Sequence, residues 1–369
     1  MQNQVKENYT ISGYFVFFLI GAPQAAAGIL NFQSHVLRDA GQDSWISIIL
    51  VGLSLHLIIW MIYKMLGNPA KDVIDLHRLI FGKLMGNAIS LLLVGYYFIM
   101  ALFYFRAYIE IIQVWVFPTV RTWAMAGLLI CMIYYVVSGG FRVVAGFSFF
   151  YMALIPLLFL LYFPIRQGNI HQLLPVLNHS FLDLLKGAKS SSFIFFGLEA
   201  LLIYFPFLKS PEKNVKWAHF ALLFTTLKYT AMIIVTLMYF SQGLLKHTLW
   251  PTLAMSKIIE LSFVARFEYF YIFMWLLVII PTVCIPIWCC TRMMKRVAAL
   301  QPRLSLPFIL AALFIAALTV NERIQIDVLE KYINEIGFYF IFAYIPLLFI
   351  INTVALKLKS NVDKSFKDG

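Results

Sequence analysis

Apolar runs of about 20 residues recur along this chain, and each is long enough to cross the hydrocarbon core of a bilayer as a helix. Of the 369 residues, 62% are hydrophobic and only 12% are charged. A soluble globular protein carries about twice that charged fraction. The alternating segments of about ten residues that mark a transmembrane β-barrel do not recur. The sequence therefore predicts an all-α polytopic membrane protein.

We expect ten transmembrane helices in a single integral membrane domain over residues 1–369. In chain order the helices cover about 11–32, 44–66, 86–117, 122–139, 143–165, 190–208, 217–240, 267–291, 304–320 and 335–357. Lys and Arg are more frequent in the loops on the side of the two termini, and this excess is typical of cytoplasmic loops. The pattern places both termini in the cytoplasm. Because of this distribution, the net charge of +12 indicates membrane orientation and a lipid bilayer as partner, with no nucleic acid.

The sixth predicted span, SSSFIFFGLEALLIYFPF from Ser190 to Phe207, carries Gly197 and the ionisable Glu199 at its middle. A carboxylate at mid-membrane depth is costly unless it faces a protein interior or water. Gly197 is the residue most able to leave helical geometry and expose backbone groups, and Pro206 marks a bend or an end. We interpret the span as an interrupted helix that lines a midplane ligand or ion site. The alternative is a helix with one buried, paired acid.

The first predicted span contains a second candidate interruption, GAPQAAAGIL from Gly21 to Leu30. Pro23 and a run of small residues can break a transmembrane helix and let other backbones approach closely. The alternative is ordinary helix packing through small residues. Two interrupted helices at corresponding positions of two five-helix halves are typical of an inverted-repeat transporter fold, with its site between the breaks. The repeats would cover about 11–165 and 190–357.

Candidate ligand-binding residues gather around the two interruptions. Backbone amides at the broken first span would meet an anionic group of a ligand, and Glu199 would hold the second break or meet a ligand amine. In the eighth span, two prolines free backbone carbonyls beside Thr282. The candidate set is Gly21, Ala22, Gln24, Gly28, Tyr97, Tyr104, Gly197, Glu199 and Thr282. For the two tyrosines, packing or interface anchoring is the alternative.

Further ionisable residues lie inside the predicted spans. Lys228 is near the centre of the seventh span, about as deep as Glu199, and is the candidate charge partner of that carboxylate. Such a pair would be structural or would respond to protons, and an unpaired Lys228 would snorkel or line water. Arg106 and Glu110 are four residues apart on one helix face, so we expect a structural ion pair there.

Sequence motifs for catalysis and for metal or cofactor binding are missing. There is no Gly-rich phosphate loop, HExxH, CxxC or GxSxG. His171 and His179 have no acidic or cysteine partner at ligand spacing. We therefore expect no enzyme activity, no cofactor and no metal, so that binding and conformational coupling remain.

Two segments are more specific than the hydrophobic pattern, namely AGQDSWIS from Ala40 to Ser47 and FGLEALLIYFPFLKSPE from Phe196 to Glu212. With them the chain resembles, over nearly its whole length, the B-subunit family of the nutrient-germinant receptors of endospores. This family is a branch of the amino acid-polyamine-organocation transporter superfamily. The resemblance implies a LeuT-type fold in the spore inner membrane, with a partly soluble A subunit and a lipoprotein C subunit as partners. It also implies a pocket at the two breaks in which a small nutrient, such as an amino acid, binds and triggers germination.

Three functions remain open at this point. The first is a receptor subunit that binds a small nutrient and passes a conformational change to its partners. The second is a secondary transporter that moves an amino acid together with a proton or another cation. The third is a subunit that scaffolds its partners without binding a nutrient.

Overall fold

The computed structural model describes residues 7–26, 28–67, 70–154, 161–245, 247–259 and 266–365. Within these ranges the chain is helical and forms no strand, and one isolated parallel bridge joins Ile11 to Leu208. Six helices of this part are long and apolar enough to cross a membrane, or up to eight spans if each of two bent helix pairs counts as one. The chain is thus an all-α multi-pass membrane protein, as predicted. The count of ten and the inverted repeat stay predictions.

The structure bounds these elements as follows. The α-helices are α1 (Phe15–Gly21), α2 (Gly28–Ala40), α3 (Ser44–Met65), α4 (Val73–Ile111), α5 (Thr122–Ser138), α6 (Phe141–Ser148), α8 (Tyr162–Gln167), α9 (Phe181–Ser191), α10 (Leu201–Tyr204), α11 (Val215–Tyr239), α12 (Gln242–Leu245), α13 (Pro251–Ser256), α14 (Phe267–Val297), α15 (Pro302–Thr319), α16 (Arg323–Tyr339) and α17 (Ile345–Ser365). Short segments used below are η2 (Pro23–Ala25), η3 (Gly41–Asp43), η5 (Phe149–Leu154), η8 (Ser192–Phe195), η9 (Leu198–Ala200), η10 (Phe205–Phe207) and the π-helical η12 (Phe340–Tyr344).

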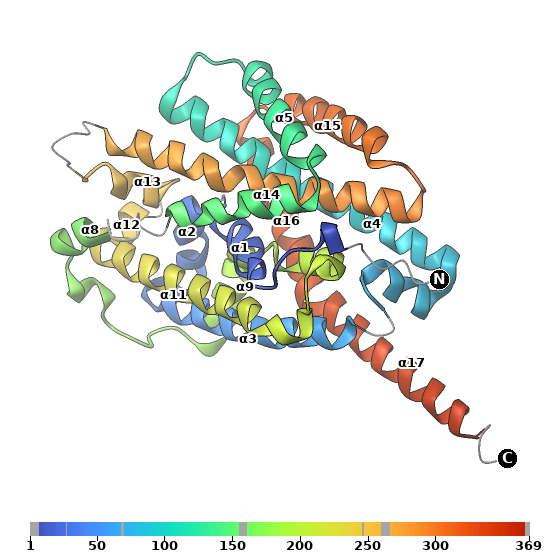
Figure 1. Ribbon diagram of the computed structural model, residues 1–369. Coiled ribbons are helices and arrows are strands. Elements are labelled where there is room, and N and C mark those ends of the chain that lie inside the picture. Colours follow the sequence, from blue (N-terminus) through green and yellow to red (C-terminus); the bar gives the residue numbers. More distant parts are fainter. Residues whose placement is uncertain are drawn as a thin grey trace.

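Two pairs of long helices enclose the short, broken elements. Helix α14 packs along α4, and α11 packs along α3. In Figure 1 the labels of α1, α2 and α9 lie between these pairs, while α17 extends from the body of the molecule at the lower right. Most side chains of α1 and nearly all of those from 191 to 205 are buried. The interruptions of the chain therefore lie in the protein interior, as backbone groups outside a helix require at membrane depth.

The sixth span begins at Phe181, earlier than the predicted start near 190. A capping box starts α9: the Ser180 hydroxyl accepts a hydrogen bond from the backbone N–H of Asp183, and the Asp183 carboxylate accepts one from the N–H of Ser180. Such a box satisfies N–H groups that the first helical turn leaves free. Residues 181–189, which include three charged side chains, are helical for this reason, although the sequence indicated a loop there.

The tenth span also begins earlier than predicted, at Arg323 instead of about 335. Glu322 and Gln325 form the capping box of α16. The first turns of α16 are polar, and Asp327 and Glu330 face a polar cavity of the protein. A hydropathy window excludes such a segment because it assumes lipid on all sides.

Helix α4 begins at Val73, ahead of the predicted third span at about 86–117. Asp72 caps its start by accepting a hydrogen bond of 3.0 Å from the N–H of Asp75. Gly82, with φ +77°, bends the chain inside α4, a conformation that favours glycine. The fifth span predicted at 143–165 contains α6, η5 and α8, but residues 155–160, with Pro156, lie outside the described residues.

Candidate functional site

The first span breaks between α1 and α2, as predicted. Pro23 has no backbone N–H, so it cannot donate to the carbonyl of Leu19 and the α-helix ends before it. One 3-10 turn, η2, follows, and Ala26 then leaves helical geometry with φ −77° and ψ −135°. The carbonyls of Gln24 and Ala25 are consequently available to partners from other helices.

The sixth span breaks at Gly197, also as predicted. Phe196 is extended, and Gly197 has φ +102°, in the left-handed region that favours glycine. The two parts of the span, Phe181–Phe195 and Leu198–Phe207, are bent by 55° relative to each other. The N–H of Gly197 is therefore free of the helical hydrogen-bond pattern.

The two breaks lie directly against each other. A Cβ atom built on Gly197 would lie 2.2 Å from Cβ of Pro23, and one built on Gly28 would lie 3.0 Å from the ring of Phe193. No larger side chain fits at Gly197 without movement of the first break. We call this contact region of residues 22–26, Gly28 and residues 193–199 the break junction.

Glu199 binds the second break to helix α4. Its carboxylate is fully buried and accepts hydrogen bonds from the Gly197 N–H at 2.8 Å and from the Tyr96 hydroxyl at 2.7 Å. The hydroxyl of Tyr97 donates to the backbone carbonyl of Glu199 at 3.0 Å. The buried acid is thus paired with an N–H and a hydroxyl, and both helix partners come from one turn of α4 (residues 96 and 97).

Gln24 connects the first break to the second break and to α11. Its amide nitrogen donates to the carbonyl of Phe195 at 2.9 Å, and its amide oxygen accepts from the hydroxyl of Thr225 at 2.7 Å. Its backbone carbonyl accepts from the Tyr229 hydroxyl at 2.6 Å. The indole N–H of Trp275 on α14 donates to the carbonyl of Ala25 at 3.1 Å. Side chains thereby satisfy the carbonyls that the break releases.

Lys228 lies beside the first break but is not brought to Glu199. Its ammonium donates to the hydroxyl of Tyr151 at 3.2 Å and lies 4.7 Å from the ring centroid of Tyr229. Glu199 has the different partners given above. Among the described residues the two opposite charges are therefore stabilised separately, Lys228 through two aromatic rings and Glu199 through hydrogen bonds.

The other candidate residues take different positions. Gly21 packs against the ring of Tyr151, and Ala22 is fully buried at the end of α1. Tyr104 is buried on α4. The Thr282 hydroxyl donates to the carbonyl of Val278 in its own helix at 2.7 Å. Within the described ranges no hydrogen bond connects Tyr104 or Thr282 to either break.

The expected ion pair of Arg106 with Glu110 is wrong. Glu110 accepts two hydrogen bonds, of 3.0 and 2.9 Å, from the guanidinium of Arg323 at the start of α16. Arg106 is 1% exposed, and its Nε and Nη1 have no hydrogen-bond partner among the described residues. Helical spacing allowed the pair, but Nη1 of a guanidinium from another helix donates to both oxygens of the carboxylate instead.

Four residues that were not among the predicted site residues complete the break junction. They are Tyr96, Thr225, Tyr229 and Trp275, and each donates a hydrogen bond to a break residue. Thr225 and Tyr229 are four residues apart and therefore share one face of α11. That spacing was a usable signal, because it places two hydroxyl donors on one side of a membrane span.

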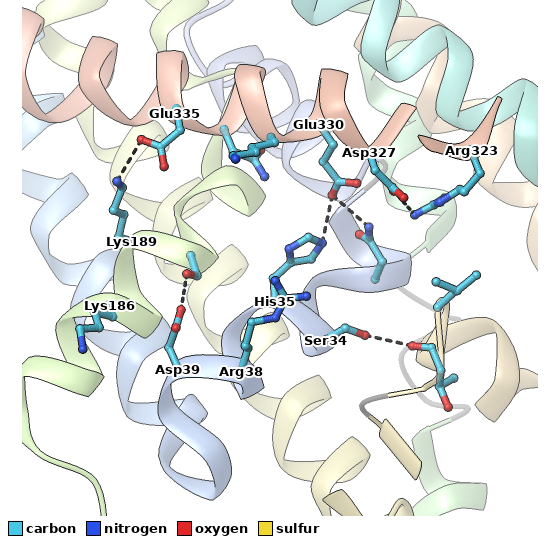
Figure 2. Close-up of a pocket in the computed structure, with 16 residues that line it drawn as sticks. Ser34, His35, Arg38, Asp39, Lys186, Lys189, Arg323, Asp327, Glu330 and Glu335 are labelled. Carbon is cyan, nitrogen blue, oxygen red and sulfur yellow. Dashed lines mark hydrogen bonds and ion pairs between the residues drawn. The ribbon is translucent and has the colours of Figure 1, made fainter. Parts of the chain in front are cut away.

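A polar cavity of about 720 Å³ lies where α2, α9 and α16 meet (Figure 2). His35 on α2 lies 3.2 Å from the Glu330 carboxylate on α16, and Lys189 on α9 lies 2.9 Å from Glu335. Asp39 on α2 accepts a hydrogen bond from Ser190 on α9. Helices α2 and α9, which flank the two breaks, therefore form walls of the cavity, and polar contacts connect both walls to each other and to α16.

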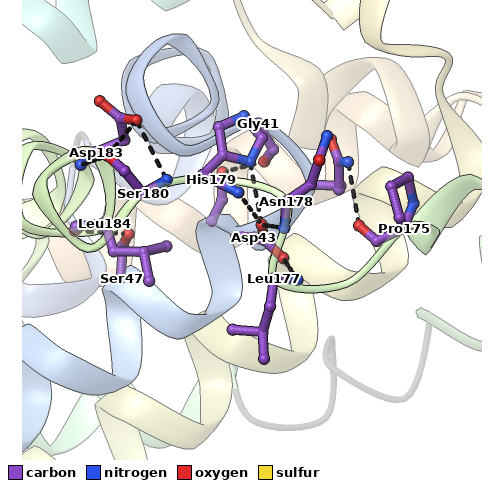
Figure 3. A network of polar contacts seen from close by, with 12 residues as sticks. Gly41, Asp43, Ser47, Pro175, Leu177, Asn178, His179, Ser180, Asp183 and Leu184 are labelled. Carbon is purple, nitrogen blue, oxygen red and sulfur yellow. Dashed lines mark hydrogen bonds and ion pairs between the residues drawn. The ribbon is translucent and has the colours of Figure 1, made fainter.

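Asp43 fixes the loop that leads into α9 (Figure 3). Its buried carboxylate accepts backbone N–H hydrogen bonds from Leu177 at 2.7 Å, Asn178 at 2.8 Å and His179 at 3.1 Å. The His179 ring nitrogen lies 3.0 Å from the same carboxylate. The turn after the first span thus holds the start of the sixth span, which explains the acid in the AGQD segment.

The chain is similar to known proteins over most of its length. A family model described as "Spore germination protein" matches residues 10–326, which include both breaks and the Asp43 loop. The chain belongs to the spore germination protein family. The resemblance predicted from two sequence segments is thereby confirmed.

Three relatives show how far this spore germination family similarity extends. Spore germination protein GerQB of Bacillus cereus is 37% identical over 358 residues, which cover 96% of this chain and 99% of the relative. Spore germination protein YndE of Bacillus subtilis strain 168 is 24% identical over 88% of this chain and 91% of its own. Spore germination protein A2 of the same strain is 23% identical over 92% of this chain and 94% of its own. The similarity spans the whole helical bundle.

Proposed function

We propose that this protein is the membrane subunit of a spore nutrient-germinant receptor and that it binds a small nutrient, such as an amino acid, at the break junction. It acts in the spore inner membrane with both termini in the cytoplasm. Its partners are an A-type subunit and a C-type lipoprotein subunit. It works by binding and conformational coupling and catalyses no reaction. Membership in the spore germination family and the multi-pass fold support this proposal.

The observation that carries the proposal is the concentration of non-helical backbone groups at the break junction. The N–H of Gly197 and the carbonyls of Phe195 and Ala25 are all satisfied by side chains. An amino or carboxylate group of a nutrient has the same hydrogen-bonding capacity as these side chains and can replace them. Preformed backbone dipoles at a broken helix are typical of sites for small charged solutes in membrane proteins.

The same contacts supply a route for a signal. Three hydrogen bonds tie the breaks to three other helices. Tyr96 on α4 donates to Glu199, and Thr225 on α11 donates to Gln24. Trp275 on α14 donates to the backbone carbonyl of Ala25. A nutrient that displaces Gln24 from Phe195 releases the first break from the second. The displacement changes how α2 and α9 lie relative to the long helices, and partner subunits read that change.

Secondary transport of an amino acid with a proton or cation is the second candidate function. Two broken helices in contact favour it, because transporters of the inverted-repeat class bind their substrates between such breaks. The junction is the same in both functions, so uptake and binding must be measured separately.

Reconstituted full-length protein tests the proposal against a panel of amino acids, sugars and nucleosides. The expected result is that at least one compound raises the unfolding temperature, that the same compound fails to germinate spores lacking the gene, and that the chain alone drives no gradient-dependent uptake. Accumulation of that compound by the chain alone would assign transport. Unchanged germination of the deletion strain with every compound would overturn the receptor function.

A further inference from the structure

A large basic cavity lies at the end of the molecule that carries Tyr9, away from the break junction. Its volume is about 1000 Å³, and its walls come from α4, α5, α6, α14 and α15. Among the residues that the structure describes, five cationic side chains line it, and no Asp or Glu does. The cations are Arg78, Arg292, Lys295, Arg296 and Arg303.

In the described part of the chain, Arg296 is the one cation of these five that forms an ion pair with an acid. The carboxylates of its partners, Asp72 and Asp75, also attract Arg292 without an ion-pair contact. Arg296 pairs with the carboxylates of Asp72, at 2.7 Å, and Asp75. Arg78 donates to two neutral oxygens, those of the Asn87 side chain and the Arg296 backbone, both at 2.8 Å. Like charges around one cavity repel each other, and the repulsion is relieved when an anion binds among them.

Arg292 is held in place with an unused donor. Its guanidinium carbon lies 5.0 Å from the ring centroid of Phe207, and that ring packs against Trp288 at 5.0 Å and Phe141 at 5.1 Å. The Nε atom of Arg292 is buried and has no acceptor among the described residues. A guanidinium stacked on an aromatic ring is well suited to bind a phosphate through two parallel N–H groups.

The opposite wall of the cavity is apolar and continues onto the outer surface of the bundle. Tyr134 and Val137 on α5 and Leu306 on α15 line it. Helices α5 and α15 pack together, and Tyr134 is 49% exposed while Phe308 on α15 is 75% exposed. A ligand with a phosphate and an acyl chain matches both walls, whereas an inorganic anion uses the basic wall alone.

We propose that this cavity binds the phosphate group of an anionic phospholipid, with Arg292 and Arg303 as phosphate ligands and an acyl chain along α5 and α15. Arg292, Lys295 and Arg296 lie at the C-terminal end of the membrane helix α14, a position at which clusters of Lys and Arg recognise anionic headgroups. The site shares no residue with the break junction, so it is independent of nutrient binding. Free phosphate has the same chemistry as the headgroup and is distinguished by the experiment.

Native mass spectrometry of the detergent-purified full chain tests the lipid site. The protein is mixed with phosphatidylglycerol, with phosphatidylcholine or with inorganic phosphate, and the bound fraction is measured. Wild type is expected to retain phosphatidylglycerol over phosphatidylcholine. Arg292→Gln and Arg303→Gln are each expected to weaken this binding about fivefold or more, since one cation near a lipid surface has about that effect.

Matched variants keep the test decisive. Arg303 is exposed, so Arg303→Gln measures the effect of the lost charge on lipid binding even if Arg292→Gln unfolds the protein. Arg292→Lys keeps the positive charge at the position that stacks on Phe207. Lys213→Gln removes an exposed charge outside the cavity and is expected to bind lipid as wild type does. Displacement of the lipid by inorganic phosphate, with direct phosphate binding, would assign a free phosphate site. Equal phosphatidylglycerol retention by wild type and both Arg→Gln variants would overturn the proposal.

Discussion

Gly197 and Pro23 lie in contact although they belong to different halves of the chain. A Cβ atom on Gly197 would lie 2.2 Å from Cβ of Pro23, so the two breaks meet because the residue at the second break has no side chain. Around this contact the freed backbone groups are satisfied by Gln24, Glu199 and Trp275. Interruption of the helices and close approach of the breaks are therefore parts of the same arrangement.

Replacement of Gly197 by alanine is the first test of this contact. The left-handed φ of +102° strains any L side chain, and the new methyl group overlaps Pro23. We expect Gly197→Ala to lower the free energy of unfolding by about 3 kcal/mol, measured by titration with sodium dodecyl sulfate in mixed micelles. The control is Gly95→Ala, where a Cβ meets nothing within 4 Å, and it should be neutral or stabilising. Equal effects of both variants would contradict the contact.

Gln24 is expected to carry much of the cohesion between the breaks. Gln24→Leu leaves the Phe195 carbonyl and the Thr225 hydroxyl without their partner in a buried site. The expected loss is about 2–4 kcal/mol in the same unfolding titration, since an unsatisfied buried polar group costs about 1–3 kcal/mol. Gln113→Leu is the control, because Gln113 is only partly buried. A loss for Gln24→Leu no larger than that of the control would show that the Gln24 contacts do not join the breaks.

Asp43 is expected to hold the entry to α9. Asp43→Asn replaces one of two acceptor oxygens by an NH₂ group that faces the N–H donors of the loop. We expect a loss of about 2 kcal/mol in unfolding free energy, the range of a hydrogen bond to a charged group. Asp183→Asn changes an exposed cap of the same helix and should have a smaller effect. The loop 175–180 should also become accessible to protease in Asp43→Asn, and resistance equal to wild type would count against the role of Asp43.

The buried carboxyl of Asp72 is expected to make the stability of the folded protein depend on pH. It lies between two membrane-spanning helices, and burial raises its pKa above the ordinary value of 3.8 although the Arg296 guanidinium opposes the shift. Folding therefore disfavours the ionised carboxyl, and the folded state loses stability as pH rises from 3.8 through the raised pKa. Asn keeps the cap of α4 and has no charge. The stability of Asp72→Asn relative to wild type should therefore increase as pH rises from 4 to neutrality.

Asp72→Ala serves as the control for the pH experiment. It removes the cap as well and should cost about 1 kcal/mol more than Asp72→Asn at every pH. The measurement is the unfolding temperature of the three proteins from pH 4 to pH 7. A difference between Asp72→Asn and wild type that is constant with pH would contradict the direction of the pKa shift.

The sequence was sufficient for the features that depend on local chemistry. Pro23 and Gly197 interrupt their helices because of their own backbone properties, and both interruptions were predicted at the right residues. The apolar runs predicted a helical membrane protein, and the AGQD and FGLE segments predicted the family. The starts of α9 and α16 were missed because polar residues face the protein there and not lipid.

The sequence did not predict which side chains of different helices contact each other. Glu110 was assigned to Arg106 by helical spacing, but Arg323 from another helix binds it with two hydrogen bonds. Lys228 and Glu199 were placed at equal depth, yet depth does not fix the direction of a side chain around the helix axis. Such contacts depend on how helices rotate against each other in the packed bundle, which a single sequence does not determine.

The most direct test of the nutrient site compares Glu199→Gln with Glu110→Gln in spores that contain equal amounts of each protein. Both changes remove one buried carboxylate, but only Glu199 lies at the break junction. The rate of nutrient-triggered germination is followed by the fall in optical density. We expect the loss of response to be at least tenfold greater for Glu199→Gln than for Glu110→Gln. Near-wild-type germination of both variants would contradict a nutrient site at the break junction.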